Sequence, residues 1–158
     1  MVFETMSETE RQSWITLIAD SIVLAWFWKA MAPGWSLIPT VTEPEAVGRV
    51  FLSVVVLTIV THAVIAAVFN LRRGKDDIEL DERDRDAQGY GSHVGYLAMY
   101  FGVGATMLAL LSGYVFPEDV GGPFKIMTVV HALFVLVILS YLADLARNVA
   151  MILRYRSI

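Results

Sequence analysis

The sequence predicts an all-α fold, an integral membrane four-helix bundle, and two observations carry that prediction. The 158 residues are 56% hydrophobic, with a mean hydropathy of +0.59, which is more apolar than a typical soluble domain. Four apolar segments occur, and each is long enough to cross about 30 Å of hydrocarbon at about 1.5 Å per residue. We therefore expect one transmembrane domain over residues 1–158, surrounded by membrane lipid.

Composition also excludes several classes of function. A net charge of −4 and a pI near 5.3 argue against direct nucleic-acid binding, which needs a basic face. Cysteine is absent, so disulfides, thiolate metal sites and cysteine nucleophiles are excluded. The acidic first ten residues lack the basic leader of a signal peptide, so we expect the first apolar segment to stay as an anchor.

The first two helices are predicted over residues 13–31 and 46–70. Ser7 and Glu10 have the spacing of a capping box, so a helix is expected to begin there and to continue into the first segment. Pro33 ends that segment, and a second capping box with Pro44 near the first turn begins the next one.

The last two helices are predicted over residues 92–114 and 124–146, with a turn at residues 117–123 between them. A charged stem, residues 72–90, precedes the third helix, and twelve of the fifteen residues from 72 to 86 are charged. A basic tail, residues 147–158, follows the fourth, and no helix breaker interrupts it before Tyr155. Helices 3 and 4 are thus expected to extend into the cytoplasm.

Lysine and arginine counts set the expected orientation. The side that would hold both termini and the stem has nine: Arg11, Arg72, Arg73, Lys75, Arg83, Arg85, Arg147, Arg154 and Arg156. The opposite side has three: Lys29, Arg49 and Lys125. We expect a multi-pass membrane protein with both termini and the stem in the cytoplasm.

The stem's acids invite a magnesium-diphosphate interpretation, because Asp76, Asp77 and Asp81 resemble half of an aspartate-rich motif. Such a site needs oxygen ligands that converge from two places, and the chain has no second aspartate cluster. Acids four residues before arginines, such as Glu79 before Arg83, instead favour a solvated helix. We expect no metal site here and no catalytic residues.

Two polar residues are predicted inside the membrane at nearly equal depth, Asp20 and His62. Each lies roughly 10–12 Å from the cytoplasmic end of its helix by the helical rise. A carboxylate at that depth should face the bundle and be paired or protonated. The pair is either a proton-responsive or ion site, or an interhelical contact that fixes helix register.

Histidine spacing argues against haem, so no cofactor is expected. His131 and His62 are offset by about 13 Å along the membrane normal, too far for two axial ligands of one iron.

A stripe of small residues runs along the third helix in alternating steps of four and three, the repeat of a left-handed helix seam. Small residues allow helices to approach closely in lipid. The stripe serves either packing within the bundle or assembly, as a homo-oligomer or with a helix of a membrane-protein partner. Its members are Gly91, Gly95, Ala98, Gly102, Ala105, Ala109 and Ser112.

The motif Asp81-Glu82-Arg83-Asp84, with the terminal Arg154-Tyr155-Arg156, resembles a group of small uncharacterised bacterial four-helix membrane proteins with a cytoplasmic DERD-type motif. The segment after the motif, residues 86–89, departs from that group's pattern. The resemblance implies a membrane-tethered regulatory role, with a small helix-turn-helix regulator as one expected partner.

Two functions are compatible with these features. The first is a non-enzymatic interaction, regulatory or accessory subunit that recognises a partner through Asp81, Glu82, Arg83 and Asp84. The alternative is a small proton-coupled transporter or pore that uses Asp20 and His62.

Overall fold

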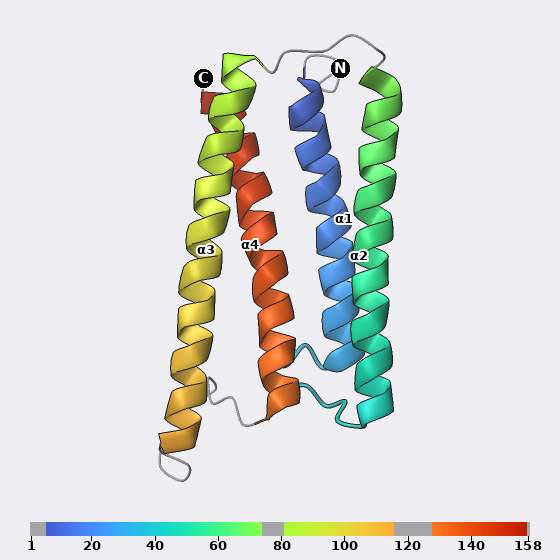
Figure 1. Cartoon of the computed structure of the whole chain (residues 1–158), viewed down its shortest axis with the longest axis vertical. Coiled ribbons are helices and arrows are strands. Elements are labelled where there is room, and N and C mark those ends of the chain that lie inside the picture. Colours follow the sequence, from blue (N-terminus) through green and yellow to red (C-terminus); the bar gives the residue numbers. More distant parts are fainter. Residues whose placement is uncertain (1–5, 74–80, 116–127, 158) are drawn as a thin grey trace.

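The computed structural model describes residues 6–73, 81–115 and 128–157. These residues form four helices, α1 (Glu8–Met31), α2 (Pro44–Arg73), α3 (Glu82–Val115) and α4 (Val129–Ser157), which run alongside one another (Figure 1). Of the described residues, 88% are helical, and none of them lies in a strand. The predicted all-α, four-helix architecture is confirmed.

The first two helices begin where the capping signals stand. The Ser7 hydroxyl accepts a hydrogen bond from the Glu10 backbone N–H at 3.1 Å, which satisfies one of the free donors of the first turn. This cap starts α1 at Glu8, before the apolar segment itself. Proline occupies the first position of α2, where its fixed φ angle suits a helix and its missing N–H removes no bond.

The last two helices are longer than their apolar segments. The third helix begins at Glu82, before its predicted apolar segment starts at residue 92. The fourth ends at Ser157, beyond the predicted end of its apolar segment at residue 146. Helices of 34 and 29 residues measure about 51 and 44 Å, so each exceeds about 30 Å of hydrocarbon. The expected start at residue 124, the turn at residues 117–123 and stem residues 74–80 lie outside the described residues.

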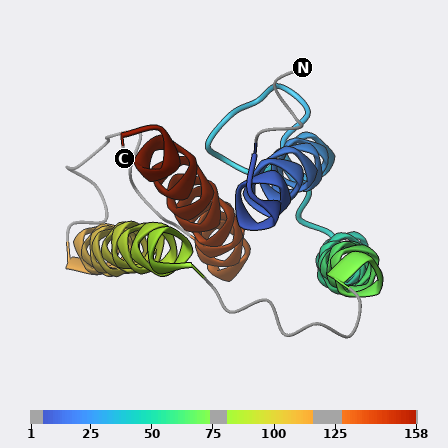
Figure 2. The same ribbon diagram turned by 90° about the horizontal axis from the view of Figure 1, so that it is seen from above.

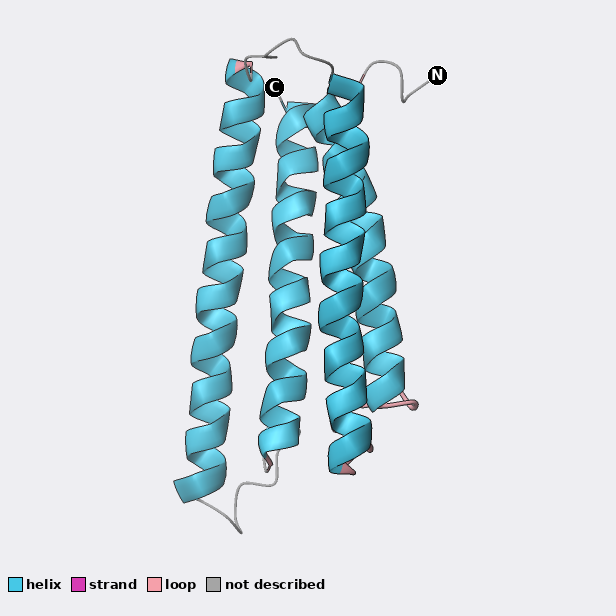
Figure 3. Cartoon of the chain, turned by 45° about the vertical axis from the view of Figure 1, so that its right-hand side comes forward, coloured by secondary structure: helices cyan, strands magenta, loops and turns pink. Residues whose placement is uncertain are grey.

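All four helices are long and apolar enough to cross a membrane. They lie nearly parallel (Figure 3). The beginnings of α1 and α3 and the ends of α2 and α4 gather at the same end of the molecule (Figure 1).

The helices form an open row in the order α3, α4, α1, α2 (Figure 2). The main packing contacts are those of α4 with α3 and with α1, and of α1 with α2. An aromatic cluster fills the core: the Phe27 ring lies 5.4 Å from that of Phe51 and 5.7 Å from that of Phe134. Both Phe27 and Phe134 are 0% exposed. The core therefore joins α1, α2 and α4.

The two flanking helices, α2 and α3, present mostly apolar side chains outward. In the 18-residue apolar stretch of each of these two helices, only 6% is buried inside the protein, against 28% for the corresponding stretches of α1 and α4. Residues such as Ile59, Val64, Phe101 and Leu108 are exposed. Lipid tails would suit such an apolar surface, and the backbone polar groups beneath it are already paired within each helix.

Candidate functional site

The two polar residues that are predicted to lie inside the membrane meet in the structure. Asp20 of α1 is 1% exposed, and its Oδ1 lies 3.6 Å from Nε2 of His62 on α2. The helical rise predicts that Asp20 and His62 lie at nearly equal depth, and the structure brings the two side chains together. Whether the pair has a function or only fixes helix register remains a prediction.

The orientation of the His62 ring is set by its own helix. Its Nδ1 lies 3.0 Å from the main-chain oxygen of Thr58, one turn earlier. A carbonyl oxygen can only accept, so Nδ1 carries the hydrogen. In the neutral ring, Nε2 then holds a lone pair, and this lone pair faces the Asp20 carboxylate.

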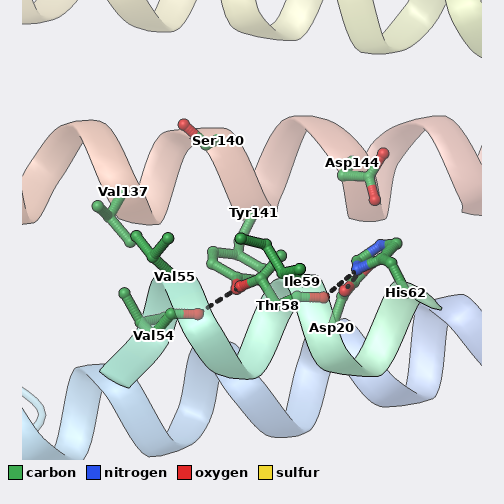
Figure 4. Close-up of a pocket in the computed structure, with 10 residues that line it drawn as sticks. All are labelled: Asp20, Val54, Val55, Thr58, Ile59, His62, Val137, Ser140, Tyr141 and Asp144. Carbon is green, nitrogen blue, oxygen red and sulfur yellow. Dashed lines mark hydrogen bonds and ion pairs between the residues drawn. The ribbon is translucent and has the colours of Figure 1, made fainter. Parts of the chain in front are cut away.

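A third ionisable side chain, Asp144 of α4, completes the cluster. One ligand atom from each of Asp20, His62 and Asp144 lies within 4.8 Å of the other two. Figure 4 shows Asp20 beside His62, with Asp144 facing them from α4. Arg147 Nη1 lies 3.6 Å from Asp144 Oδ1, and Asn148 Nδ2 lies 3.5 Å from Asp144 Oδ2. We call Asp20, His62 and Asp144 the three-helix cluster.

Sequence reasoning missed Asp144, although a signal was present. It is an acid within the predicted fourth segment, and the argument applied to Asp20 applies to it as well. What the sequence did not give was the order of the helices, which places α4 against α1.

The buried carboxylate of the cluster, Asp20, has one neighbour that can carry positive charge, the His62 ring, which is charged only when it is protonated. Oδ2 of Asp20 is buried and has no hydrogen-bond partner. Two carboxylates that face each other in a medium of low dielectric repel, unless a proton or another cation lies between them. A proton on one of these groups, or a bound cation, would relieve that repulsion.

A pocket of about 390 Å³ opens beside the cluster, between α2 and α4 (Figure 4). At one side of it, the hydroxyl groups of Thr58 and Tyr141 are hydrogen-bonded to each other, which links α2 to α4. The pocket gives the cluster an opening on the surface. Its lining comprises Asp20, Val54, Val55, Thr58, Ile59, His62, Val137, Ser140, Tyr141 and Asp144.

A second polar cluster joins the charged helix ends. The Tyr155 hydroxyl donates to Asp84 Oδ1 at 2.5 Å, and the Ser7 hydroxyl donates to the same oxygen at 3.3 Å. Arg83 donates to the main-chain oxygen of Tyr155, and its guanidinium lies over the Tyr155 ring. These contacts, which we call the end cluster, bind the first turns of α3 to α4 and to the start of α1.

The four stem residues predicted for recognition thus divide into two pairs. Arg83 and Asp84 have partners inside the chain. Asp81 and Glu82 are exposed. One turn further along α3, Asp86 forms an ion pair with Arg154 at 2.7 Å.

The small-residue stripe faces α4 over part of its length. A Cβ at Gly91 would lie 2.2 Å from Met151 Cγ, one at Gly95 would lie 2.9 Å from Arg147 Cβ, and one at Gly102 would lie 2.9 Å from a Leu139 methyl. These glycines pack within the bundle. The rest of the stripe is half-buried at Ala98, Ala109 and Ser112 and exposed at Ala105.

No protein-family model, curated protein or solved structure matches this chain. The fold and the two clusters define its class on their own: a helical bundle with four candidate membrane spans, an ionisable cluster among three of them with one buried member, Asp20, and a charged cluster at one end.

Proposed function

We propose that the chain is a non-enzymatic multi-pass protein of the bacterial cytoplasmic membrane that acts as an interaction, regulatory or accessory subunit. Its amino and carboxyl ends lie in the cytoplasm. Two facts support this topology: nine of the twelve lysines and arginines fall on one side by sequence, and the start of α1 and the end of α4 share one end of the molecule (Figure 1). Short segments rich in lysine and arginine stay cytoplasmic.

The observation that carries the proposal is the end cluster. It holds the first turns of α3 against α4, so the charges that remain free are presented by an ordered helix instead of a loop. Asp81, Glu82 and Arg85 are exposed there. A partner that binds such a surface does not have to order it first, which lowers the entropic cost of association.

The partner chemistry follows from these charges. The exposed acids at the start of α3 suit a basic cytoplasmic surface, on a second copy of the chain, on another membrane protein or on a small helix-turn-helix regulator. Direct nucleic-acid binding is not part of the proposal, since the chain is acidic overall.

Charge reversal at the start of α3 tests the proposal. Tagged protein is cross-linked in native membranes, purified, and its partners are identified by mass spectrometry. The variant Asp81→Lys with Glu82→Lys should lose a partner that the wild type captures. The matched control, Glu43→Lys with Glu45→Lys, reverses two exposed acids at the start of α2 and should retain it. Identical partners in all three samples would contradict the proposal.

A small proton-coupled transporter or pore that uses Asp20 and His62 is the second candidate, and the pocket between α2 and α4 favours it. Asp20 and His62 line that pocket, and ionisable residues inside a span that face a cavity are typical of proton and ion pathways. In liposomes, Asp20→Asn should abolish proton-driven uptake, whereas Asp86→Asn at the helix end should leave it unchanged. Wild-type uptake in the Asp20→Asn variant, or the same loss of uptake in both variants, would exclude this candidate.

A further inference from the structure

We infer that Asp20, His62 and Asp144 form a binding site for one divalent transition-metal ion of the Zn²⁺ class, held between α1, α2 and α4. The inference goes beyond both proposed functions, since metal binding is measured without any partner or flux. Four features of the three-helix cluster support it.

The first feature is the spacing of the donor atoms. Two ligands bound at about 2.1 Å to a tetrahedral ion lie about 3.4 Å from each other. His62 Nε2 and Asp20 Oδ1 are 3.6 Å apart, and the Asp144 donor lies within 4.8 Å of both. The three atoms reach bonding distance if the Asp144 carboxylate moves by up to about 1.4 Å, the difference between the largest separation and the ligand spacing of a tetrahedral ion.

The second feature is charge. Two carboxylates beside a neutral imidazole carry a charge of −2, and a divalent ion neutralises it fully, whereas a monovalent ion leaves an excess charge in a medium of low dielectric. Asp20 is 1% exposed and its Oδ2 has no hydrogen-bond partner. Arg147 compensates Asp144 only weakly, because its side chain is 48% exposed and its Nη1 lies 3.6 Å from Asp144 Oδ1.

The third feature is the preset histidine. Nδ1 donates to the Thr58 carbonyl at 3.0 Å, the kind of outer contact that fixes the tautomer and ring direction of a metal-binding histidine. Nε2 is left as an acceptor that faces another acceptor, Asp20 Oδ1. Two acceptors in that position repel unless a proton or a metal ion lies between them, and a metal ion bound there would satisfy both.

The fourth feature is the ligand set itself. Mg²⁺ and Ca²⁺ prefer oxygen ligands throughout, whereas an imidazole with two carboxylates suits Zn²⁺, Mn²⁺ or Co²⁺. Three protein ligands leave at least one coordination position for water or a further ligand. The adjoining pocket of about 390 Å³ has room for that ligand.

Calorimetric titration tests the inference. The full-length protein, purified in mild detergent with its histidine tag removed and treated with a chelator, is titrated with ZnCl₂. One Zn²⁺ ion should bind per chain, with Mg²⁺ at least tenfold weaker. Asp20→Asn, His62→Gln and Asp144→Asn should each weaken Zn²⁺ binding at least tenfold. The matched controls His93→Gln and Asp86→Asn alter exposed residues of α3 and should bind as the wild type does.

Absence of saturable Zn²⁺ binding by the wild type would overturn the inference, as would unchanged affinity in the three ligand variants. Circular dichroism and gel filtration check that each variant is folded. If a variant does not fold, X-ray absorption of the zinc-loaded wild type decides the question instead. A spectrum with one imidazole and oxygen neighbours supports the site, and one with no imidazole or with two imidazoles refutes it.

Discussion

The seam between α3 and α4 gives the sharpest quantitative prediction, through the substitution Gly91→Ala. The added Cβ would lie 2.2 Å from Met151 Cγ and 2.9 Å from the main-chain oxygen of Arg147. Met151 is 5% exposed, so its side chain has little free space to move into. The main-chain oxygen belongs to α4 itself and moves only if the two helices separate.

The expected loss of stability combines two opposing terms. Overpacking in a filled interface typically costs about 1–3 kcal/mol. Alanine favours a helix over glycine by about 1 kcal/mol. The difference between the two terms is a loss of up to about 2 kcal/mol, or a melting temperature lower by up to about 8 °C for a chain of this size.

The other glycines of α3 supply a ranked series. Gly95→Ala should cost less than Gly91→Ala, because its closest contact is the Arg147 Cβ at 2.9 Å and the nearest backbone atom is at 3.3 Å. Gly102→Ala should cost less again, since the atom it meets is the end of a leucine side chain. A Cβ added at Gly89 or Gly104 would meet no atom within 4 Å, so alanine there should be neutral or slightly stabilising.

Thermal unfolding in detergent, followed by tryptophan fluorescence, measures this series directly. Gly89→Ala is the matched control for Gly91→Ala, because the two residues lie two positions apart on the same helix. Equal melting temperatures for these two variants would refute the packing argument. A drop at Gly104 as large as that at Gly91 would instead indicate that the opposite face of α3 packs against another chain.

Three further predictions concern stability and use the same unfolding assay. Phe134→Ala removes a ring that is 0% exposed and should lower the free energy of unfolding by about 3–5 kcal/mol; a loss below about 1 kcal/mol would show that the aromatic core is not formed. Tyr155→Phe deletes the hydroxyl that donates to Asp84 at 2.5 Å and should cost about 1–3 kcal/mol, because the acceptor is charged; the end cluster is unimportant for stability if nothing is lost. Asp86→Asn breaks an exposed ion pair with Arg154 and should cost less than about 1 kcal/mol, with no effect in high salt; a large, salt-independent loss would contradict this.

Much of the fold could be predicted from the sequence, because length and hydropathy alone determine which segments are candidate spans. The ends of the helices were less predictable. The charged residues at the start of α3 are helical from Glu82 onward, and the sequence indicated this only through weak acid–arginine spacing. Their contacts with α4, such as Asp84 with Tyr155, depend on two segments that lie 71 residues apart.

The candidate site was predictable in part. The matching depths of Asp20 and His62 could be calculated from the helical rise, because the two residues lie on consecutive antiparallel helices. Asp144 was not found, because depth does not say which helix faces which. In lipid, apolar surface gives no preference for one neighbour over another, so the order α3, α4, α1, α2 follows from shape and polar contacts that a single sequence does not reveal.

The two flanking helices are held by different contacts, so the end cluster positions α3 and the three-helix cluster positions α2. α3 is held by glycine packing and by the end cluster, neither of which involves α2. Only 6% of the 18-residue apolar stretch of α2 is buried. In lipid, the polar links of α2, Thr58 to Tyr141 and His62 to Asp20, would therefore contribute a larger share of its positioning than they would in water. An ion bound by Asp20, His62 and Asp144 would therefore fasten α2 to both α1 and α4. The same ion would leave the α3–α4 seam unchanged, because none of its three ligands lies on α3.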